Sequence, residues 1–225
     1  MYLEDIIGPV MVGPSSSHTA GAARIGKVAL MLLGEKVQHA DILLHGSFFT
    51  TGKGHGTDKA LVAGLLGLNV DDPNISRSFE LAEQEGLVYR FGEVDLGGDA
   101  HPNSVMLALK GVSGKRLEVV AASIGAGRIK VTGLDGMQVA FGANMPTLVI
   151  EHNDHPGVMA EVTALLLEKN INIATMSLYR SGRGGRAQMV LECDQEVPDE
   201  AVQELRERSD ILRVIYFSQA GKQDD

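Results

Sequence analysis

The sequence predicts an α+β (mixed α/β) protein, and three observations support that prediction. The 225 residues contain 44% hydrophobic and 22% charged side chains, the balance of a soluble globular protein. Segments with helical apolar spacing alternate with short runs of strand character. The pattern restarts near residue 143, so we expect a mixed-sheet domain at 1–142 followed by a second domain at 147–225.

The first half combines a buried helix with several strands. Small residues at 20–26, followed by an apolar run to residue 33, predict the helix. A strand is expected over 38–49, a glycine-rich turn over 50–56, and a helix from Thr57 or Asp58 to about Gly67. The remaining elements are a short polar helix at 78–85 and strands at 87–94, 104–110, 116–124 and 129–132. The turn at 111–114 predicts a hairpin.

The second half has the order strand, helix, strand, strand, helix, strand. Strands are expected over 147–152, 171–179, 187–193 and 211–217. The turn at 153–157 leads into a helix with an apolar face that ends near Asn170, and Pro198 begins a second helix that runs to Arg208. This order is typical of a ferredoxin-like βαββαβ domain.

Composition and charge exclude several classes of function. Twenty Lys and Arg against 29 Asp and Glu give a net charge of −9, whereas binding of a nucleic-acid backbone needs clustered basic residues. The apolar run at 29–33 is too short to cross a bilayer, and the acidic start at 1–5 lacks the basic residues of a signal peptide. We therefore expect a cytoplasmic protein with neither nucleic-acid nor membrane partners.

The chain has one cysteine, Cys193, within an apolar stretch. A single cysteine can neither form an internal disulfide nor hold a zinc or iron–sulfur centre. We expect it to be a buried strand residue. No metal ligand is assigned to this chain, so chemistry that needs several thiolates would require another one.

The most informative segment is residues 13–19, Gly-Pro-Ser-Ser-Ser-His-Thr, which leads directly into the first helix. Hydroxyls and free backbone N–H groups gather there at the positive end of a helix dipole, an arrangement that binds carboxylate or phosphate. The simpler interpretation is that Ser17 or Thr19 caps the helix. Three serines and a histidine exceed what a cap requires, so both interpretations stay open.

The second half resembles the ACT domain, a regulatory module that commonly binds amino acids. The resemblance depends on the Asp154-His155-Pro156-Gly157 turn and on Asn170-Ile171-Asn172-Ile173, which opens the next strand. It implies a regulatory ligand beside Asn153, Asp154 and Gly157, on the helix N-terminal amides. The alternative is that Gly157 is purely structural, because many ACT domains only mediate assembly of oligomers.

The first half resembles the β subunit of iron–sulfur-dependent L-serine dehydratases. The matching segments are 13–19, His45-Gly46-Ser47, 52–58 with its Gly-Lys-Gly-His sequence, His101-Pro102-Asn103 and 123–127. The resemblance implies a lyase that converts L-serine to pyruvate and ammonia, in serine catabolism and gluconeogenesis. It also implies a [4Fe–4S] cluster carried by a partner α subunit, and a homo-oligomer formed through the ACT domain.

The same resemblance implies roles for individual residues. His55 is the first choice for proton transfer, because it lies on a glycine-rich turn and imidazole titrates near neutral pH. His18 is the second choice for the catalytic role, and it could instead orient the carboxylate or cap the helix beside it. The hydroxyls expected to bind the carboxylate of L-serine are those of Ser15, Ser16, Ser17 and Thr19, and Lys53 could pair with it. The alternatives are a solvated loop histidine at 55 and an ordinary surface lysine at 53.

His45 is expected to be structural, whereas His101 and Asn103 could line the same site. A second function class also stays open. The first half resembles the extra regulatory domain of some phosphoglycerate dehydrogenases, which would make the chain a non-catalytic sensor of serine. A pure assembly module that dimerises through the ACT sheet edge is a third possibility. Only the enzyme needs His55 and Lys53.

Overall fold

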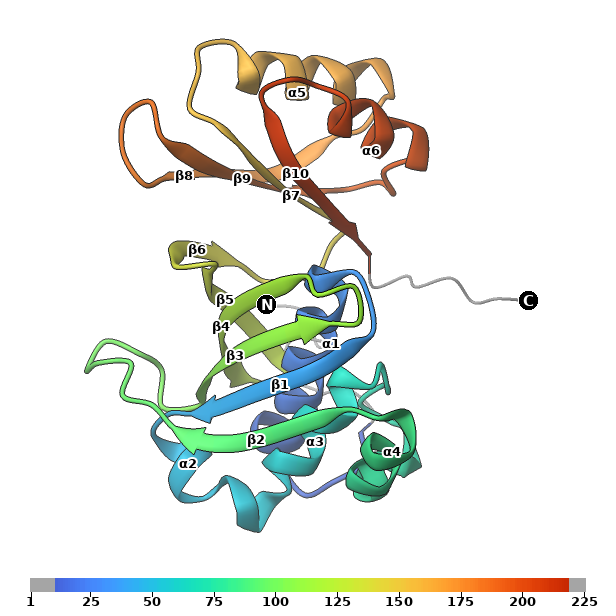
Figure 1. The fold of residues 1–225 in the computed structure, drawn as a ribbon, viewed down its shortest axis with the longest axis vertical. Helices are drawn as coiled ribbons and strands as arrows, with labels where there is room; N and C mark the ends of the chain where they lie inside the picture. Colours follow the sequence, from blue (N-terminus) through green and yellow to red (C-terminus); the bar gives the residue numbers. More distant parts are fainter. Residues whose placement is uncertain (1–10, 219–225) are drawn as a thin grey trace. The chain divides into compact units, whose positions relative to one another are not determined.

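The structure is a computed structural model that describes residues 11–218. The acidic N-terminal residues and the outer ends of both predicted domains lie outside this range. The chain divides into two compact units after Gly136. The exact domain boundaries predicted above, at 142 and 147, stay predictions, whereas the α+β class is confirmed in the mixture of helices and two sheets (Figure 1).

Helices and strands alternate through the first unit. Its helical elements are a π-helical turn at Ser16–Ala20, α1 (Gly21–Leu33), α2 (Ser47–Thr50), a 3₁₀ turn at Gly52–His55, α3 (Thr57–Leu65), a 3₁₀ turn at Pro73–Arg77 and α4 (Ser78–Glu85). The strands are β1 (Val37–Leu44), β2 (Val88–Glu93), β3 (Ser104–Gly111), β4 (Arg116–Gly125) and β5 (Arg128–Leu134). One strand that the sequence did not predict, β6 (Met137–Phe141), follows the division between the units.

The strands of the first sheet lie in the order β2-β1-β3-β4-β5-β6. β1 pairs in parallel with β2 and antiparallel with β3, while β3 to β5 form an antiparallel meander. Helices α1 and α3 lie together on one face of this sheet (Figure 1). Alternate residues of β1 point to that side, so Ala40, Ile42 and Leu44 are buried, as period-2 alternation requires.

Helices α1 and α3 touch backbone to backbone at a pair of glycines. A Cβ atom added to Gly64 would lie 2.7 Å from the backbone N of Lys27 and 2.9 Å from Cα of Gly26. One added to Gly26 would lie 2.9 Å from the backbone N of Leu65. Neither position has room for a side chain, so glycine at both is what lets the two helices approach this closely.

The strand predicted over 38–49 is wrong at its C-terminal end. The chain leaves β1 after Leu44, and Gly46 takes a left-handed φ of 55°, where a Cβ atom would lie 2.7 Å from the carbonyl oxygen of Pro102. The carbonyl of Pro102 then accepts hydrogen bonds from the backbone N–H groups of Ser47 (2.7 Å) and Phe48 (3.3 Å). These bonds hold the first turn of α2, so residues 47–50 form a helix.

The second unit has a four-stranded sheet in the order β10-β7-β9-β8. Its elements are β7 (Thr147–Asn153), α5 (Val158–Glu168), β8 (Ile173–Arg180), β9 (Arg186–Cys193), α6 (Asp199–Arg206) and β10 (Ile211–Phe217). This is the predicted βαββαβ order. Its core includes Leu148, Ile150, Val162, Met189 and Leu205. All strand pairs in this sheet are antiparallel.

Cys193 belongs to the same core. It is a free thiol with no exposed surface, which confirms the prediction of a buried strand cysteine. Burial, followed by the nearby carboxylate of Asp194, raises the pKa of the thiol to about 11. The side chain therefore stays protonated near neutral pH and packs as a small apolar group.

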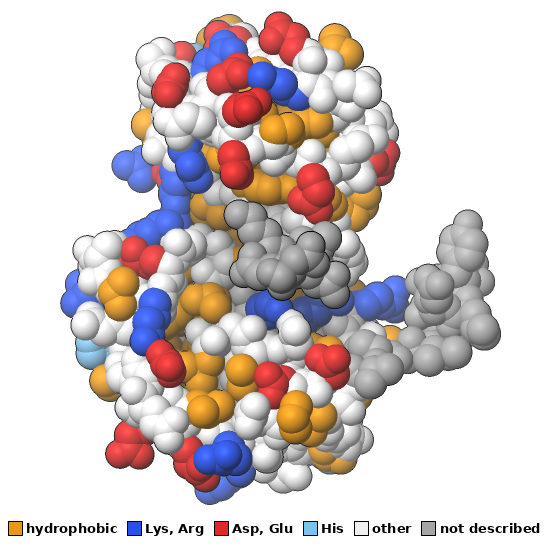
Figure 2. Space-filling view, turned by 90° about the vertical axis from the view of Figure 1, so that its right-hand side faces the viewer, with side chains coloured by type: hydrophobic (Ala, Val, Ile, Leu, Met, Phe, Trp, Pro, Cys, Tyr) orange, Lys and Arg blue, Asp and Glu red, His pale blue; other side chains and the backbone are white. Residues whose placement is uncertain are grey.

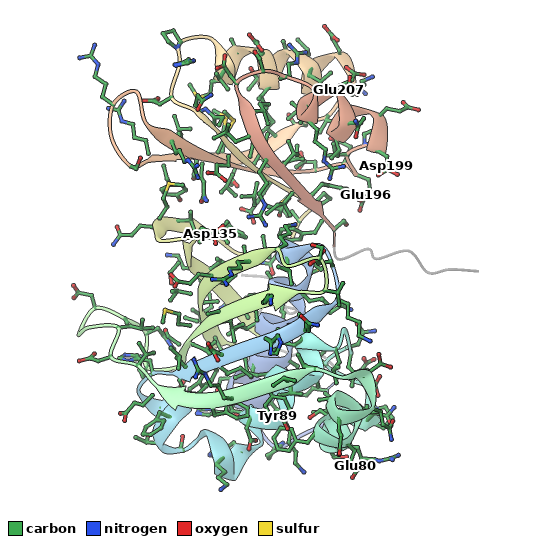
Figure 3. The ribbon with its side chains drawn as sticks, in the orientation of Figure 1. Glu80, Tyr89, Asp135, Glu196, Asp199 and Glu207 are labelled. Atoms are coloured by element: carbon green, nitrogen blue, oxygen red, sulfur yellow. The ribbon has the colours of Figure 1, made fainter. Side chains whose placement is uncertain are left out.

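Two acidic groups organise the start of α6. Asp199 lies in its first turn, near the positive end of the helix dipole. Glu196 lies just before the helix (Figure 3) and accepts hydrogen bonds from the hydroxyls of Tyr216 and Ser218. The Tyr216 oxygen in turn accepts the backbone N–H of Val197 at 3.0 Å. These bonds fasten the segment before α6 to β10.

The surface shows charges of both signs. On the face drawn in Figure 2, acidic and basic side chains lie beside one another on each unit. Within residues 11–218, no helix is long and apolar enough to cross a membrane.

The glycine contact between α1 and α3 gives a stability prediction. Replacing Gly64→Ala should destabilise the protein by about 1–3 kcal/mol, because the new methyl group forces the two helix backbones apart. Urea unfolding followed by circular dichroism measures the change. Gly98→Ala is the matched control, since its Cβ would meet nothing within 4 Å and no left-handed φ is involved. Equal stability of the two variants would contradict the close contact.

Candidate functional site

The serine turn, residues 15–19, is capped by Ser15. Its Oγ accepts the backbone N–H of His18 at 3.1 Å, and its carbonyl accepts the N–H of Thr19 at 2.9 Å. The prediction that Ser17 or Thr19 is the cap is therefore wrong. The cap lies earlier because the helix begins with a π-helical turn at Ser16–Ala20, which adds one turn before α1.

The capping arrangement leaves donors available at the helix start. The N–H groups of Ser16 and Ser17 have no hydrogen-bond partner within residues 11–218, as expected for the first residues of a helix. The hydroxyl of Ser16 is likewise without a partner in this part of the chain. Together with the dipole of α1, these groups form a place that can bind a carboxylate.

His18 is held on both sides of its ring. Nδ1 lies 3.2 Å from Oγ of Ser17, and Nε2 lies 3.2 Å from both Oγ of Ser47 and Oγ1 of Thr51. The buried ring of Phe48 contacts the imidazole edge-on at a centroid distance of 5.4 Å. The orientation of His18 is therefore fixed by groups from the serine turn and from α2.

His55 lies beside His18 but is held differently. Their ring centroids are 5.0 Å apart with the planes inclined at 48°. The backbone of His55 is fastened to the serine turn, because its carbonyl accepts the hydroxyl of Thr19 at 3.1 Å. Its ring is exposed and makes no hydrogen bond among the described residues. The structure thus brings the two predicted proton-transfer residues together.

The electrostatics of the pair favour a neutral His18. Burial lowers the pKa of His18, and repulsion from His55 lowers it further, while a hydrogen bond at Ser47 acts in the opposite direction. A neutral imidazole can accept a proton at one nitrogen while it donates at the other.

The other residues predicted to bind the carboxylate differ in burial and in their contacts. Ser15 and Ser17 are half-buried, with their Oγ atoms 3.4 Å apart. Thr19 is buried, and its hydroxyl donates to the His55 carbonyl. It therefore holds the His55 backbone against the serine turn. Lys53 is exposed and makes no ion pair within residues 11–218.

Close packing supports the serine turn. Gly13 has a left-handed φ of 122°, and a Cβ there would lie 2.9 Å from Oγ1 of Thr19. A Cβ on Gly21 would lie 2.7 Å from Cβ of Ser123 on β4. Both glycines therefore allow the turn to lie directly against its neighbours, and the 123–127 segment acts as a support for the helix start.

Two further histidines of the first unit, His45 and His101, have structural contacts. Nδ1 of His45 lies 3.2 Å from the carbonyl of Val94 and 3.3 Å from the N–H of Leu96, so it fastens the loop after β2 to the end of β1. Nδ1 of His101 accepts the N–H of Asn103 at 3.1 Å. The expectation that His101 and Asn103 line the site stays a prediction; the turn they form presents Pro102 to α2.

The sequence assigned no role to Ser47 and Thr51, which contact His18. Read as part of a strand, two residues four positions apart would lie about 13 Å from each other. On a helix they share one face, and here their hydroxyl oxygens are 3.1 Å apart. Predicting α2 as a helix would have revealed the pair.

A second candidate site lies in the second unit, at the start of α5. A cavity of about 480 Å³ is lined there by His152, Asp154, Gly157, Arg180 and other residues. Gly157 has a φ of 100°, and a Cβ on it would meet nothing within 4 Å. Its left-handed backbone opens the helix N-terminus to this cavity.

Two polar side chains of the cavity, Asp154 and His152, differ in how completely they are hydrogen-bonded. Asp154 accepts hydrogen bonds from the N–H of Gly184 (3.0 Å) and from Arg180 (3.4 Å), which lower its pKa. His152 is 3% exposed, and its Nδ1 must donate to the carbonyl of Asn153 at 2.8 Å. Nε2 of His152 is a buried ring nitrogen that no hydrogen bond within residues 11–218 satisfies.

The donor set of this chain does not fit an iron–sulfur cluster. Cluster ligation uses several cysteine thiolates, whereas the single cysteine is buried in the second unit with a raised pKa. No group of three or more His, Cys, Asp or Glu side chains within residues 11–218 is arranged to hold a metal ion.

Comparisons with known proteins agree with both halves of the chain. The profile of the serine dehydratase beta chain family matches residues 5–133, and that of the ACT domain matches residues 147–210. The chain is 40% identical over 210 residues to the probable L-serine dehydratase beta chain of Bacillus subtilis strain 168, covering 93% of this chain and 94% of that protein.

Two further relatives extend the comparison. The L-serine dehydratase beta chain of Peptoniphilus asaccharolyticus is 38% identical over 216 residues, which cover 96% of this chain and 95% of that protein. The D-3-phosphoglycerate dehydrogenase of Bacillus subtilis strain 168 is 27% identical over 194 residues. That alignment covers 86% of this chain but 36% of the dehydrogenase.

The histidine pair gives a prediction for titration. His18 should titrate below pH 6.5 in the folded protein, and the His55→Ala variant should raise its pKa by removing the repulsion between the two rings. Because the unfolded chain binds more protons between the two pKa values, this group makes the protein less stable as pH falls through that range.

Nuclear magnetic resonance of the imidazole signals against pH measures both effects. His39→Ala is the control, since His39 is an exposed residue on β1 without a contact to the pair. A His18 pKa that is the same in wild type and His55→Ala would contradict the coupling.

Proposed function

The chain belongs to the serine dehydratase beta chain family, and on that premise we propose how its first unit takes part in the reaction. It is one part of an L-serine dehydratase, a lyase, and carries an ACT domain at its C-terminal end. The proposal is that the serine turn binds the carboxylate of L-serine and that His55 or His18 moves a proton. The observation that carries it is the juxtaposition of this turn with two imidazoles 5.0 Å apart.

The groups proposed to bind the carboxylate are the donors of the serine turn that make no other hydrogen bond. The N–H groups of Ser16 and Ser17 and the hydroxyl of Ser16 are without partners in the described residues. Hydrogen bonds to a charged group each contribute about 1.5–3 kcal/mol. Two or three of them at a helix N-terminus are enough to orient a small amino acid. Lys53 is exposed and without an ion pair in that range, so it is a further candidate partner for the carboxylate.

His55 is the better candidate for proton transfer between the two histidines. Its ring is exposed and unconstrained by hydrogen bonds within residues 11–218, so it can approach a bound substrate. His18 is held in place and favoured in its neutral form. We assign it to orienting the substrate beside the serine turn. Removal of the α proton and loss of the β hydroxyl would yield aminoacrylate, which hydrolyses to pyruvate and ammonia.

The remainder of the active site is proposed to come from an α subunit. Its [4Fe–4S] cluster would supply a Lewis acid that makes the substrate hydroxyl a better leaving group. This chain has no donor set for a cluster, so its own contribution is limited to binding, orientation and proton transfer. The beta-chain names of the relatives support a two-chain enzyme. A cytoplasmic location and a role in gluconeogenesis belong to the same proposal.

The alternative is a sensor that binds serine without chemistry, as in a regulatory domain of phosphoglycerate dehydrogenases. The match to the Bacillus dehydrogenase over about a third of its length supports it. The beta-chain relatives have higher identity and match this chain over 93% and 96% of its length. A sensor also leaves His55 and its position beside His18 without a purpose, so the enzyme subunit is favoured.

We also propose that the second unit binds a regulatory amino acid. The support is the cavity at Gly157, which has helix amides for a carboxylate and is also lined by His152 and Asp154. Asp154 is engaged by Gly184 and Arg180, so it orders the cavity wall, and Asn153 contributes its carbonyl to His152.

A homo-oligomer through this unit is part of the proposal. β8 is an edge strand of its sheet. Met176 and Leu178 on that strand are each 43% exposed. An unpaired edge with exposed apolar residues can pair with a second copy of the chain.

Substitution of His55 tests the proton-transfer role. In a complex with the α chain, His55→Ala should lower kcat for pyruvate formation by roughly 10²- to 10⁴-fold, the usual contribution of a general acid or base. The measurement is an anaerobic pyruvate assay, accompanied by iron content and assembly state. His39→Ala should retain full activity. Normal turnover of His55→Ala with intact assembly would remove this residue from the mechanism.

Two substitutions separate the two proposed binding sites. Calorimetry of the full chain with L-serine should show weaker binding at the serine turn in Ser16→Ala, by roughly 10- to 100-fold. Gly157→Ala should affect only the second unit, because its φ of 100° strains an alanine and the methyl group projects into the cavity. Gly182→Ala is the control for the second site, with no left-handed φ and an open surrounding. Binding unchanged by Gly157→Ala would contradict the regulatory site.

A further inference from the structure

The hydrogen bonds of Thr51 restrict where its one proton can be. Oγ1 of Thr51 lies 2.8 Å from the carbonyl oxygen of Ser47, one helical turn earlier in α2. A carbonyl only accepts, so the hydroxyl of Thr51 must donate to it. Thr51 therefore presents only lone pairs to its other neighbours, which are Nε2 of His18 at 3.2 Å and Oγ of Ser47 at 3.1 Å.

This restriction distinguishes the two neutral forms of the His18 ring. With the proton on Nε2, the ring donates toward Thr51 and Ser47, the Ser47 hydroxyl donates to Thr51, and the Ser17 hydroxyl donates to Nδ1. Every close pair then has one donor and one acceptor. With the proton on Nδ1, the lone pair of Nε2 would face the lone pairs of Thr51 at 3.2 Å, and only the Ser47 hydroxyl could satisfy it.

We propose that Thr51 is a positioning residue that selects the Nε2–H form of His18, so that Nδ1 is the basic atom and faces the serine turn. The hydrogen bond made by one ring nitrogen decides which nitrogen of a histidine carries the proton. Phe48, which packs edge-on against the ring, keeps it from turning over. The selected form is the one in which the lone pair of His18 points to the substrate-binding side.

The assignment also changes the expected role of Ser17. Its hydroxyl proton is committed to Nδ1 of His18 at 3.2 Å, so in the free protein Ser17 does not donate to an incoming carboxylate. That task stays with the hydroxyl of Ser16. The Ser15 oxygen accepts the backbone N–H of His18, and its own proton is the one that can donate to Oγ of Ser17 at 3.4 Å. The statement about substrate rests on the proposed function, whereas the tautomer does not.

The chain offers a matched control one residue away. Thr50 makes the same kind of bond, from its hydroxyl to the carbonyl of Gly46 at 3.2 Å, in the same short helix. It has no contact with His18 among the described residues. Thr51→Val and Thr50→Val therefore remove equivalent hydroxyls with the same change in shape, but only the first removes the acceptor beside Nε2.

Nitrogen NMR of the full chain labelled with ¹⁵N-histidine tests the proposal, with His18 assigned from its loss in His18→Gln. Wild type should show Nε2 as the protonated nitrogen and Nδ1 as the unprotonated one, near neutral pH. Thr51→Val should lose this preference, Thr51→Ser should restore it, and Thr50→Val should keep it. The wild-type spectrum alone is decisive if Thr51→Val does not fold.

Two results would overturn the proposal: a proton on Nδ1 in wild type, or an unchanged tautomer in Thr51→Val. Turnover with the α chain provides a separate test. Thr51→Val should lower kcat relative to Thr50→Val, with little change in KM, and Thr51→Ser should recover it. A changed tautomer with normal kcat would overturn the proposed role of His18 in the reaction, not the assignment of its proton.

Discussion

The contact between Gly26 and Gly64 is the constraint on which the candidate site depends. The serine turn leads into α1, and the turn that carries His55 leads into α3, so the spacing of the two helices sets the spacing of the two segments. At the two glycines the helix backbones touch, with no room for a side chain between them. The result is an imidazole pair with centroids 5.0 Å apart and a hydrogen bond from Thr19 to the His55 carbonyl. A side chain at either glycine would widen this spacing before it touched any functional residue.

Within that frame the two histidines are held in opposite ways. His18 contacts hydroxyl groups at both ring nitrogens and a buried aromatic ring, so the fold fixes its direction. Burial and the neighbouring His55 lower its pKa, which favours the neutral form. His55 has a fastened backbone and a free, exposed ring. This difference fits a division in which one imidazole orients the substrate and the other, which can move, transfers a proton. The chain supplies no cluster ligands, so such a division describes what it can contribute to a two-chain enzyme.

Both units use the N-terminus of a helix, but they open it by different means. In the first unit, a serine cap and an extra π-helical turn leave two backbone N–H groups without a partner among residues 11–218, beside polar side chains. In the second, a single left-handed glycine at 157 opens the helix start to a cavity. Substrate binding at the first place and regulation at the second would thus rely on the same physical effect, the partial positive charge of a helix start. Substitutions at Ser16 and at Gly157 would change the two helix starts independently.

The sequence alone determined the order of elements, because apolar periodicity and turn residues are local properties. It located α1, α3, α4 and nine strands to within a few residues, and it identified Ser15–Thr19 and His55 as the groups of interest. Residues 45–50 were misread, because the bonds that hold them as a helix come from Pro102, more than fifty positions away. The tertiary structure therefore decided that Ser47 and Thr51 meet His18. Contacts of this kind depend on distant segments brought together by packing, and no local pattern in the chain records them.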